Sequence, residues 1–417
     1  MIAKRRGTGG LADREPARLA EPSDAREAAA LLRAAADAGD AVVVQGGGTL
    51  QAAANLPTRY DLALATRRLD AVHAYDPRDL TIGAGAGMTL DALARTLAEH
   101  DQFIPFDAPL VARATIGGTL AAGWAGPRRA TYGRPRDLVI GASAALVDGT
   151  VASSGGMVVK NVTGYDLGKL YVGSHGTLGA LVRVNLKVLT APAARRLALA
   201  PFEPEVRERV VAHAYGRAVE PVAALLIDAA LAPRHLADGD GRPLLVALFE
   251  GSEALVDRAL REFRSALGAA GVAETRVLDD RIAAEAFQTI VDGYLASRER
   301  SVTLLARGLP SEASARAELA RSIAPEGSTI DTIADLATGD VIARLSWRPH
   351  HEAALPAAVA ALRGALGRAH RIAGDPQAWA VIDAWGETPA ALATMLALKA
   401  QFDPRSTLAP GRFFDGR

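Results

Sequence analysis

Residues 114–141 read ATIGGTLAAGWAGPRRATYGRPRDLVIG, and this glycine-rich stretch decides how the rest of the chain is interpreted. It opens with Thr115, Ile116, Gly117 and Gly118, which are followed by further small residues. Glycine reaches positive φ and, because it has no side chain, lets backbone N–H groups approach a ligand. Such a run lets a flat ring lie against the backbone. The alternative interpretation is a close-packed loop between two elements.

Two more glycine-dense segments flank this one. Residues 42–49, VVVQGGGT, are a β-branched strand that ends in a glycine loop suited to a pyrophosphate. Residues 155–181 read GGMVVKNVTGYDLGKLYVGSHGTLGAL. A tight turn would explain any one of these segments, but three within one domain length favour a single elongated ligand that threads between them. The pattern therefore predicts a dinucleotide such as FAD.

A nicotinamide-binding Rossmann domain is the main alternative. Residues 80–97, LTIGAGAGMTLDALARTL, read as a strand, a glycine turn and a helix. However, Met88 stands where the third glycine of G-x-G-x-x-G belongs, and no acidic residue ends a second strand about twenty residues further on. We therefore interpret this stretch as a structural turn.

Composition excludes several classes of function. The 417 residues suit two or three domains, and 49% of them are hydrophobic. Lys plus Arg equals Asp plus Glu at 47 each, so no net charge favours nucleic acid or an anionic membrane. The chain has no cysteine, which excludes disulfides, thiolate nucleophiles, a thioether link to a cofactor and iron–sulfur ligation by this chain. No apolar run is long enough for a membrane span.

The texture of the sequence predicts its organisation. Residues 1–22 are polar and broken by proline, so we expect a disordered tail. A helix is expected over 24–38, with Asp24 as N-cap and Gly39 as C-cap, and a hairpin over 137–156. After residue 192 glycine thins out and helices alternate with strands. This change favours a separate α+β domain, with helices packed on an antiparallel sheet.

Together the glycine segments resemble the PCMH-type FAD-binding domain of the vanillyl-alcohol oxidase superfamily. AGPRRATYG and KNVTGYDLGKL look most like the FAD-binding E subunits of glycolate oxidases. The resemblance covers residues 23–192 and the C-terminal FDPRSTLAPGRF. It implies an α+β fold in which two small α/β subdomains within 23–192 bind FAD between them. It further implies a ferredoxin-like antiparallel-sheet cap over 193–400, and a segment, 401–417, that returns to the FAD domain.

The resemblance also implies which residues bind the cofactor. The pyrophosphate loop is expected at Gln45, Gly46, Gly47, Gly48 and Thr49. The ribityl chain and isoalloxazine are expected beside Thr115, Ile116, Gly117 and Gly118. The flavin pocket is expected to include Lys160, Asn161, Gly164, Tyr165 and Asp166. The adenine half is expected against Gly176, Thr177, Leu178 and Gly179, and Arg412 would return towards the flavin.

FAD is expected to be bound non-covalently. Many relatives attach FAD through a histidine near the pyrophosphate loop, but no histidine lies between residues 45 and 72. The sequence alone does not exclude the more distant His73 and His100 as points of covalent attachment. The histidines of the second domain show no metal-binding pattern, so no metal is expected; they are His213, His235, His350, His351 and His370.

The resemblance implies an FAD-dependent oxidoreductase that acts on the CH–OH group of a small 2-hydroxy acid. It would be one subunit of a glycolate oxidase-like dehydrogenase, with a larger flavin subunit and an iron–sulfur subunit as partners. The alternative is a non-catalytic electron-relay or structural subunit. We expect a cytoplasmic protein. The alternative that stays open is peripheral attachment to the inner membrane through partner subunits.

The catalytic base is not assigned by the sequence, and Tyr165, His175 and Lys160 are candidates because they stand in the glycine motifs. A cluster of arginines either binds the substrate carboxylate or forms a solvated loop or subunit contact. Its members are Arg128, Arg129, Arg134 and Arg136.

Overall fold

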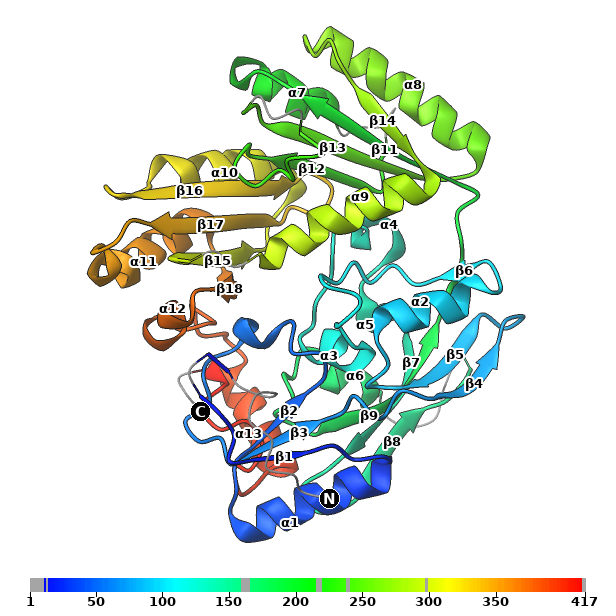
Figure 1. Cartoon of the computed structure of the whole chain (residues 1–417), viewed down its shortest axis with the longest axis vertical. Helices are drawn as coiled ribbons and strands as arrows, with labels where there is room; N and C mark the ends of the chain where they lie inside the picture. Colours follow the sequence, from blue (N-terminus) through cyan, green and yellow to red (C-terminus); the bar gives the residue numbers. More distant parts are fainter. Residues whose placement is uncertain are drawn as a thin grey trace. The chain divides into compact units, whose positions relative to one another are not determined.

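The computed structural model describes residues 11–12, 14–158, 166–214, 220–237, 241–296 and 299–414 (Figure 1). The chain divides into two compact units. The first unit comprises Met1–Ala125, Gly133–Ala191 and Asp383–Arg417, and the second comprises Gly126–Tyr132 and Pro192–Ile382. The helix α13 (Leu392–Phe402) therefore belongs to the first unit, although it falls before the boundary expected at residue 400.

The first unit begins with a parallel sheet that α1 covers. The strand order is β1 (Arg18–Ala20), β3 (Leu62–Ala65) and β2 (Val42–Gln45). The predicted helix is confirmed as α1 (Ala25–Ala38). Asp24 caps its start by accepting from two backbone N–H groups, and Gly39 ends it with φ of 73°. The buried alanines and Leu32 of α1 pack against Val42, Leu62 and Leu64.

Strand β1 lies within the segment that we expected to be a disordered tail. Its residues pair in parallel with β3, and Leu19 and Ala20 are buried. Pairing to the edge of the sheet satisfies the backbone polar groups of a stretch that looked too polar to fold alone. The expectation of a tail is therefore wrong for residues 18–20.

A five-stranded antiparallel sheet completes the first unit. Its order is β4 (Val72–Asp76), β5 (Thr81–Gly85), β9 (Ala180–Lys187), β7 (Val139–Ala145) and β8 (Val151–Gly155). The predicted hairpin is confirmed as β7 and β8, with Gly149 at φ of 86° in its turn. Strand β5 is antiparallel to both neighbours and leads into α2 (Leu90–Ala98), so this stretch is not the parallel unit of a Rossmann fold.

Short elements fill the connections of the first unit. They are β6 (Gln102–Phe103), α3 (Ile116–Ala121), α5 (Pro135–Leu138), α6 (Gly168–Tyr171) and β10 (Leu189–Thr190). Strands β6 and β10 pair with each other. The side chain of Thr115 caps α3 by accepting from the Gly118 N–H at 3.1 Å. This cap places the start of α3 within the glycine-rich stretch that opened the sequence analysis, at its Thr115-Ile116-Gly117-Gly118.

The second unit is built on one eight-stranded antiparallel sheet. Its order is β14-β11-β13-β12-β16-β17-β15-β18. The first half contains β11 (Ala194–Pro201), α7 (Arg207–Ala214), β12 (Ala223–Ile227), β13 (Leu244–Gly251), α8 (Glu253–Ala269) and β14 (Arg276–Asp279). The second half contains β15 (Ser301–Ala306), α10 (Ala313–Ser322), β16 (Ser328–Asp335), β17 (Val341–Trp347), α11 (Leu355–Leu366) and β18 (Ala369–Gly374).

Each half of this sheet is a ferredoxin-like βαββαβ motif. Numbered by their order in the chain, the four strands of each half lie in the order 4-1-3-2 from the outer edge of the sheet to its centre. The two halves meet at the centre, where β12 pairs with β16. The expected ferredoxin-like antiparallel sheet is therefore confirmed, and it is duplicated. The sequence shows no internal repeat, because ferredoxin-like halves need only the same order of elements and not the same residues.

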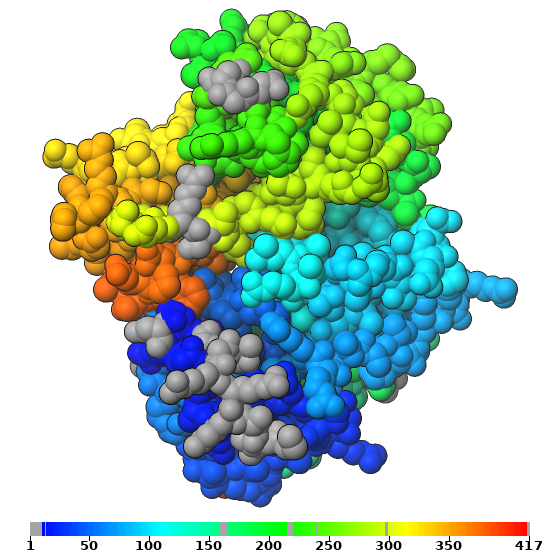
Figure 2. All heavy atoms as spheres, viewed as in Figure 1, coloured from blue at the N-terminus to red at the C-terminus, as the bar shows by residue number. Residues whose placement is uncertain are grey.

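Helices cover both faces of the sheet (Figure 1). The apolar cores of α7, α8, α10 and α11 share one cluster of buried residues with the inward side chains of the strands. Helix α9 (Asp280–Asp292) covers the opposite face and is visible across it in the space-filling view (Figure 2). The unit also contains α4 (Arg129–Tyr132) and α12 (Pro376–Val381).

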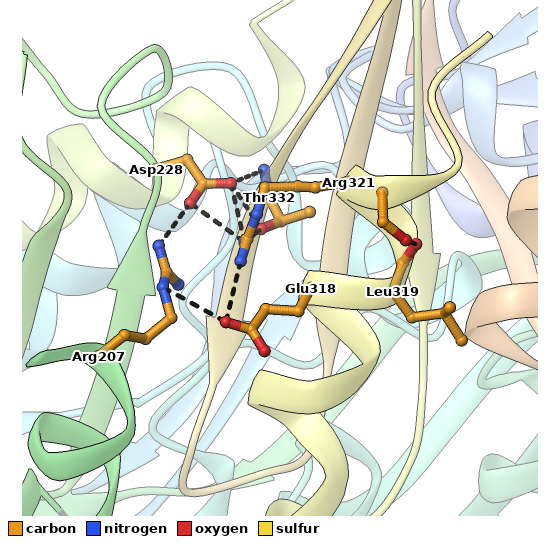
Figure 3. Close-up of polar contacts among 7 residues, drawn as sticks. Arg207, Asp228, Glu318, Leu319, Arg321 and Thr332 are labelled. Carbon is orange, nitrogen blue, oxygen red and sulfur yellow. Dashed lines mark hydrogen bonds and ion pairs between the residues drawn. The ribbon is translucent and has the colours of Figure 1, made fainter. Parts of the chain in front are cut away.

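A buried ion cluster joins the two halves of the sheet (Figure 3). Asp228, directly after β12, accepts from the backbone N–H of Thr332 on β16 at 2.8 Å. The carboxylate also accepts from Arg207 of α7 and Arg321 of α10, each at 3.2 Å. Glu318 approaches both guanidinium groups, at 4.0 and 3.8 Å. One carboxylate thus ties a helix from each half to the strands at their junction.

Candidate cofactor site

The glycine segments converge on one cavity of the first unit. The cavity opens to solvent, and its empty space, including the part that is continuous with solvent, is about 690 Å³. Its walls come from the loop after β2, the start of α3, the loop before β9 and the C-terminal segment. Ten of the predicted cofactor residues line it: Gly46, Gly47, Gly48, Thr49, Thr115, Gly117, Gly118, Gly176, Gly179 and Arg412.

Five other predicted residues lie outside this lining. The Gln45 side chain donates to the Tyr60 hydroxyl at 2.5 Å, and the Thr177 hydroxyl donates to the Ser174 carbonyl at 2.7 Å. Asp166 is exposed and forms an ion pair with Lys169 at 3.0 Å. The remaining two, Ile116 and Leu178, are buried. Lys160, Asn161, Gly164 and Tyr165 lie outside the described residues.

Several glycines are required because backbone segments touch each other here. A Cβ on Gly47 would lie 1.7 Å from the Arg113 carbonyl oxygen, and one on Gly46 would lie 2.1 Å from the Thr115 hydroxyl. The loop after β2 therefore packs directly against the residues that lead into α3. At Gly48, in contrast, φ is 72° and a Cβ would meet nothing within 4 Å. The glycines thus bring the loops together and leave backbone beside open space.

Arg412 is the buried cation of this cavity. Arg412 is 2% exposed, and its Nη2 donates to the backbone and side-chain oxygens of Gln51 at 2.9 and 2.8 Å. Its Nε and Nη1 are buried and have no hydrogen-bond partner within the described part of the chain. Burial lowers the pKa of Arg412 to about 10. A buried guanidinium with free donors is costly unless an anion satisfies it.

The C-terminal segment carries Arg412 to the glycine loop by pairing with β2. The Val42 N–H donates to the Thr407 carbonyl at 2.8 Å, and the Ala409 N–H donates to the Val42 carbonyl at 2.7 Å. Gly411, at φ of 85°, then turns the chain where a Cβ would strike Thr58 at 2.6 Å. Because β2 also leads into the glycine loop, the same strand positions both parts of the site.

His175 lines the cavity in a strained backbone conformation. Its φ is 51°, which is unusual for a residue other than glycine, and its ring meets Trp385 edge-on at 4.8 Å. Strain of this kind gathers at functional sites. The two other histidines that the sequence left open lie elsewhere. His73 borders a separate groove, and His100 packs against Tyr75 at 5.3 Å.

The arginine-rich segment forms ion pairs within the second unit. Arg128 contacts Glu250 at 3.2 Å, and Arg195 contacts the same carboxylate at 2.5 Å. Burial raises the pKa of Glu250, but the charges of the two arginines outweigh this effect and hold the pKa below its usual value. Arg129 makes a bidentate pair with Asp340, at 2.7 and 2.8 Å. Two of the four arginines of the cluster, Arg128 and Arg129, are therefore engaged by carboxylates of the protein itself.

Ala121 and Ala122, which belong to the run of small residues expected beside a flat ring, also line the cavity, whereas Gln51 and Ser174 were not among the predicted cofactor residues. Gln51 stands two residues beyond the GGGT loop, and this proximity was the one available signal. Among the described residues, no group of three or more His, Cys, Asp or Glu is arranged to hold a metal. In the same part of the chain no helix combines the length and apolar character needed to cross a bilayer.

Comparison with known proteins supports the assignment of this site. Residues 16–155 match the family described as FAD binding domain. The chain is 43% identical to the glycolate oxidase subunit GlcE of Escherichia coli K12 over 121 residues, which cover 29% of this chain and 35% of that protein.

Two further relatives match longer stretches at lower identity. Glycolate oxidase subunit GlcD of Bacillus subtilis 168 is 32% identical over 162 residues, covering 39% of this chain and 34% of that protein. D-lactate dehydrogenase of Archaeoglobus fulgidus is 32% identical over 170 residues, covering 41% of this chain and 38% of that protein. The matched stretch spans about a third of the length of each of these curated relatives.

The fold extends beyond the matched stretch. A solved structure of alkyldihydroxyacetonephosphate synthase superposes with a TM-score of 0.66 and covers 94% of this chain and 75% of that one. Because its sequence identity to this chain is 15%, the match is evidence for a shared fold and not for a shared function. Taken together, residues 16–155 are similar to an FAD binding domain, and this stretch contains two of the glycine segments that line the cavity.

Proposed function

We propose that this chain binds FAD non-covalently in the cavity of the first unit, with Arg412 as the counter-charge of the diphosphate. The observation that carries this is the pair of unpartnered donors, Nε and Nη1, on a buried guanidinium beside the glycine loop. A diphosphate offers acceptor oxygens and negative charge to both donors. Non-covalent binding is supported by the absence of cysteine and by the position of His73 and His100 outside the lining.

We further propose that the chain is an FAD-binding subunit of a glycolate oxidase-like 2-hydroxy-acid dehydrogenase. The relatives named glycolate oxidase subunits and D-lactate dehydrogenase support this proposal. When bound, the flavin would supply the hydride-accepting chemistry. The residues of this chain would bind the cofactor, exclude water from it and, at His175, place an imidazole beside it. A larger flavin subunit and an iron–sulfur subunit would be its partners in the cytoplasm or at the inner membrane.

A relay or structural subunit without substrate turnover is the second candidate. It is favoured by the engagement of Arg128 and Arg129 with Glu250 and Asp340, which removes two candidate ligands for a substrate carboxylate. Anaerobic addition of glycolate or D-lactate to the purified flavin-loaded chain separates the two candidates. Bleaching of the flavin absorbance supports turnover by this chain, and an unchanged spectrum supports the relay.

The cofactor assignment has its own test. The apo chain and its Arg412→Met variant are titrated with FAD, ADP and riboflavin, and binding is followed by fluorescence or calorimetry. We expect the variant to bind FAD and ADP more weakly and riboflavin unchanged, because only the first two carry a diphosphate. Failure of the wild-type chain to bind FAD would overturn the proposal.

A further inference from the structure

Lys399 is a buried lysine that the cofactor motifs do not include. It lies on α13, and its side chain is 15% exposed. Its Nζ donates to the carbonyl oxygens of Thr177 and Leu408, each at 2.9 Å, and to the carboxylate of Asp403. An ammonium group has three N–H donors, so all of them are used within the protein. Lys399 therefore has no donor left for a ligand. Its role has to follow from the protein groups to which it donates.

The groups that Lys399 holds lie directly beside two separate walls of the cofactor cavity. Thr177 directly follows Gly176 and comes two residues after His175, both of which line the cavity. Leu408 belongs to the segment that pairs with β2 and ends at Arg412. One ammonium group thus links the loop before β9 to the segment that delivers the buried guanidinium.

Asp403 extends this link along the C-terminal segment. Its side chain is fully buried, and it accepts from the backbone N–H groups of Thr407 at 2.9 Å and Leu408 at 2.7 Å. Leu408 is the residue that pairs with Val42 of β2, and Thr407 directly precedes it. Asp403 therefore fixes the two backbone N–H groups that precede the Leu408 carbonyl, and Lys399 fixes that carbonyl itself, four residues before Arg412.

We propose that Lys399, with Asp403, is a positioning residue for the cofactor, which holds the His175–Thr177 loop and the Leu408–Arg412 segment at the separation that FAD requires. The inference rests on the proposed function. A purely structural role, in which Lys399 only anchors α13, predicts a loss of stability without a specific effect on the cavity. The positioning role predicts that the effect of Lys399 passes through Arg412.

A double-mutant cycle on the full-length apo chain separates these roles. The dissociation constant of FAD is measured for the wild type, Lys399→Met, Arg412→Met and the double variant. Positioning predicts a loss on the order of tenfold for Lys399→Met, as expected when charged hydrogen bonds that shape a site are removed. It also predicts that the two substitutions are not independent. The double variant should lose less FAD affinity than the two single fold-losses multiplied together.

Arg321→Met is the matched control, because it also removes one cation from a buried ion pair but in the second unit. We expect it to lower the thermal midpoint while leaving the FAD dissociation constant unchanged. If Lys399→Met does not fold, the neutral pair Lys399→Gln with Asp403→Asn takes its place in the cycle.

Two results would overturn the positioning role. One is an unchanged FAD dissociation constant in folded Lys399→Met, and the other is a double variant whose losses multiply fully. Failure of the wild type to bind FAD would instead overturn the proposed function, together with this inference. The wild-type titration therefore distinguishes the two failures.

Discussion

Buried arginines occur in both units, but their surroundings differ. In the second unit Arg207 and Arg321 meet Asp228, and Arg129 meets Asp340. In the first unit Arg412 is more deeply buried than any of these, and among the described residues its side chain donates to the oxygens of Gln51. A buried guanidinium cannot lose its proton, so it needs a partner. The comparison teaches that engaged arginines hold the architecture together, whereas unpartnered donors indicate where a ligand belongs.

The largest effect is expected where two cations share one carboxylate. Asp228→Ala would leave Arg207 and Arg321 without their main counter-charge at the junction of the two sheet halves. Breaking a buried pair in this way costs about 3–5 kcal/mol. We expect chemical denaturation to show this loss of unfolding free energy, with an unchanged FAD dissociation constant. A loss below about 1 kcal/mol would show that the cluster is solvated and not architectural.

Arg412→Met should produce the opposite combination. Losing charged hydrogen bonds to a diphosphate costs about 1.5–3 kcal/mol, or about 10- to 150-fold in FAD affinity. The apo chain should lose little stability, because the variant removes a buried charge whose Nε and Nη1 have no partner among the described residues. Titration with FAD and thermal melting of the apo form check the two halves of this prediction. A strongly destabilised apo variant would place Arg412 with the architectural arginines.

Local signals in the sequence were sufficient for much of the fold and for the centre of the site. Asp24 and Gly39 fixed both ends of α1, since capping needs only neighbouring residues. The GGGT loop and the stretch Thr115–Gly118 were predicted to be cofactor segments, and residues of both line one cavity, because glycine spacing reports backbone geometry directly.

Contacts between distant residues could not be predicted in the same way. The sequence did not show that Arg128 and Arg129 meet Glu250 and Asp340, which are more than a hundred residues away. Nor did it show that the ammonium of Lys399 reaches Thr177. Such pairs depend on the register of strands and the docking of helices, which no local pattern encodes without a second sequence for comparison.

Asp335 extends the comparison to a carboxylate without an arginine of its own. Within the described residues it accepts from the backbone N–H groups of Ala337 and Thr338. Burial raises its pKa from 3.8 to about 7, with the charge of Asp340 adding to the effect. Unlike an arginine, a buried carboxylate can take up a proton and become neutral. Asp335 can therefore tolerate burial, although the charge of Arg129 only partly opposes the rise of its pKa.

This difference gives a pH dependence with a definite sign. Between pH 4 and 7 the folded chain keeps a proton on Asp335 that the unfolded chain has lost, so stability falls as the pH rises. The slope from one such proton is at most about 1.4 kcal/mol per pH unit. Asp335→Asn retains an acceptor oxygen but cannot titrate. Its advantage over the wild type should grow from pH 4 to pH 7, and parallel stability curves would contradict the shifted pKa.

The smallest effect is expected for an arginine pair in water. Arg281 and Glu285 lie one turn apart on α9, at 2.5 Å, with side chains 81% and 61% exposed. Solvent already satisfies both groups, so Glu285→Ala should change the unfolding free energy by less than about 0.5 kcal/mol. Measured beside Asp228→Ala, this variant tests whether burial, and not the count of ion pairs, sets the value of an arginine. A loss comparable to that of Asp228→Ala would remove the contrast on which the identification of Arg412 as a ligand-facing cation depends.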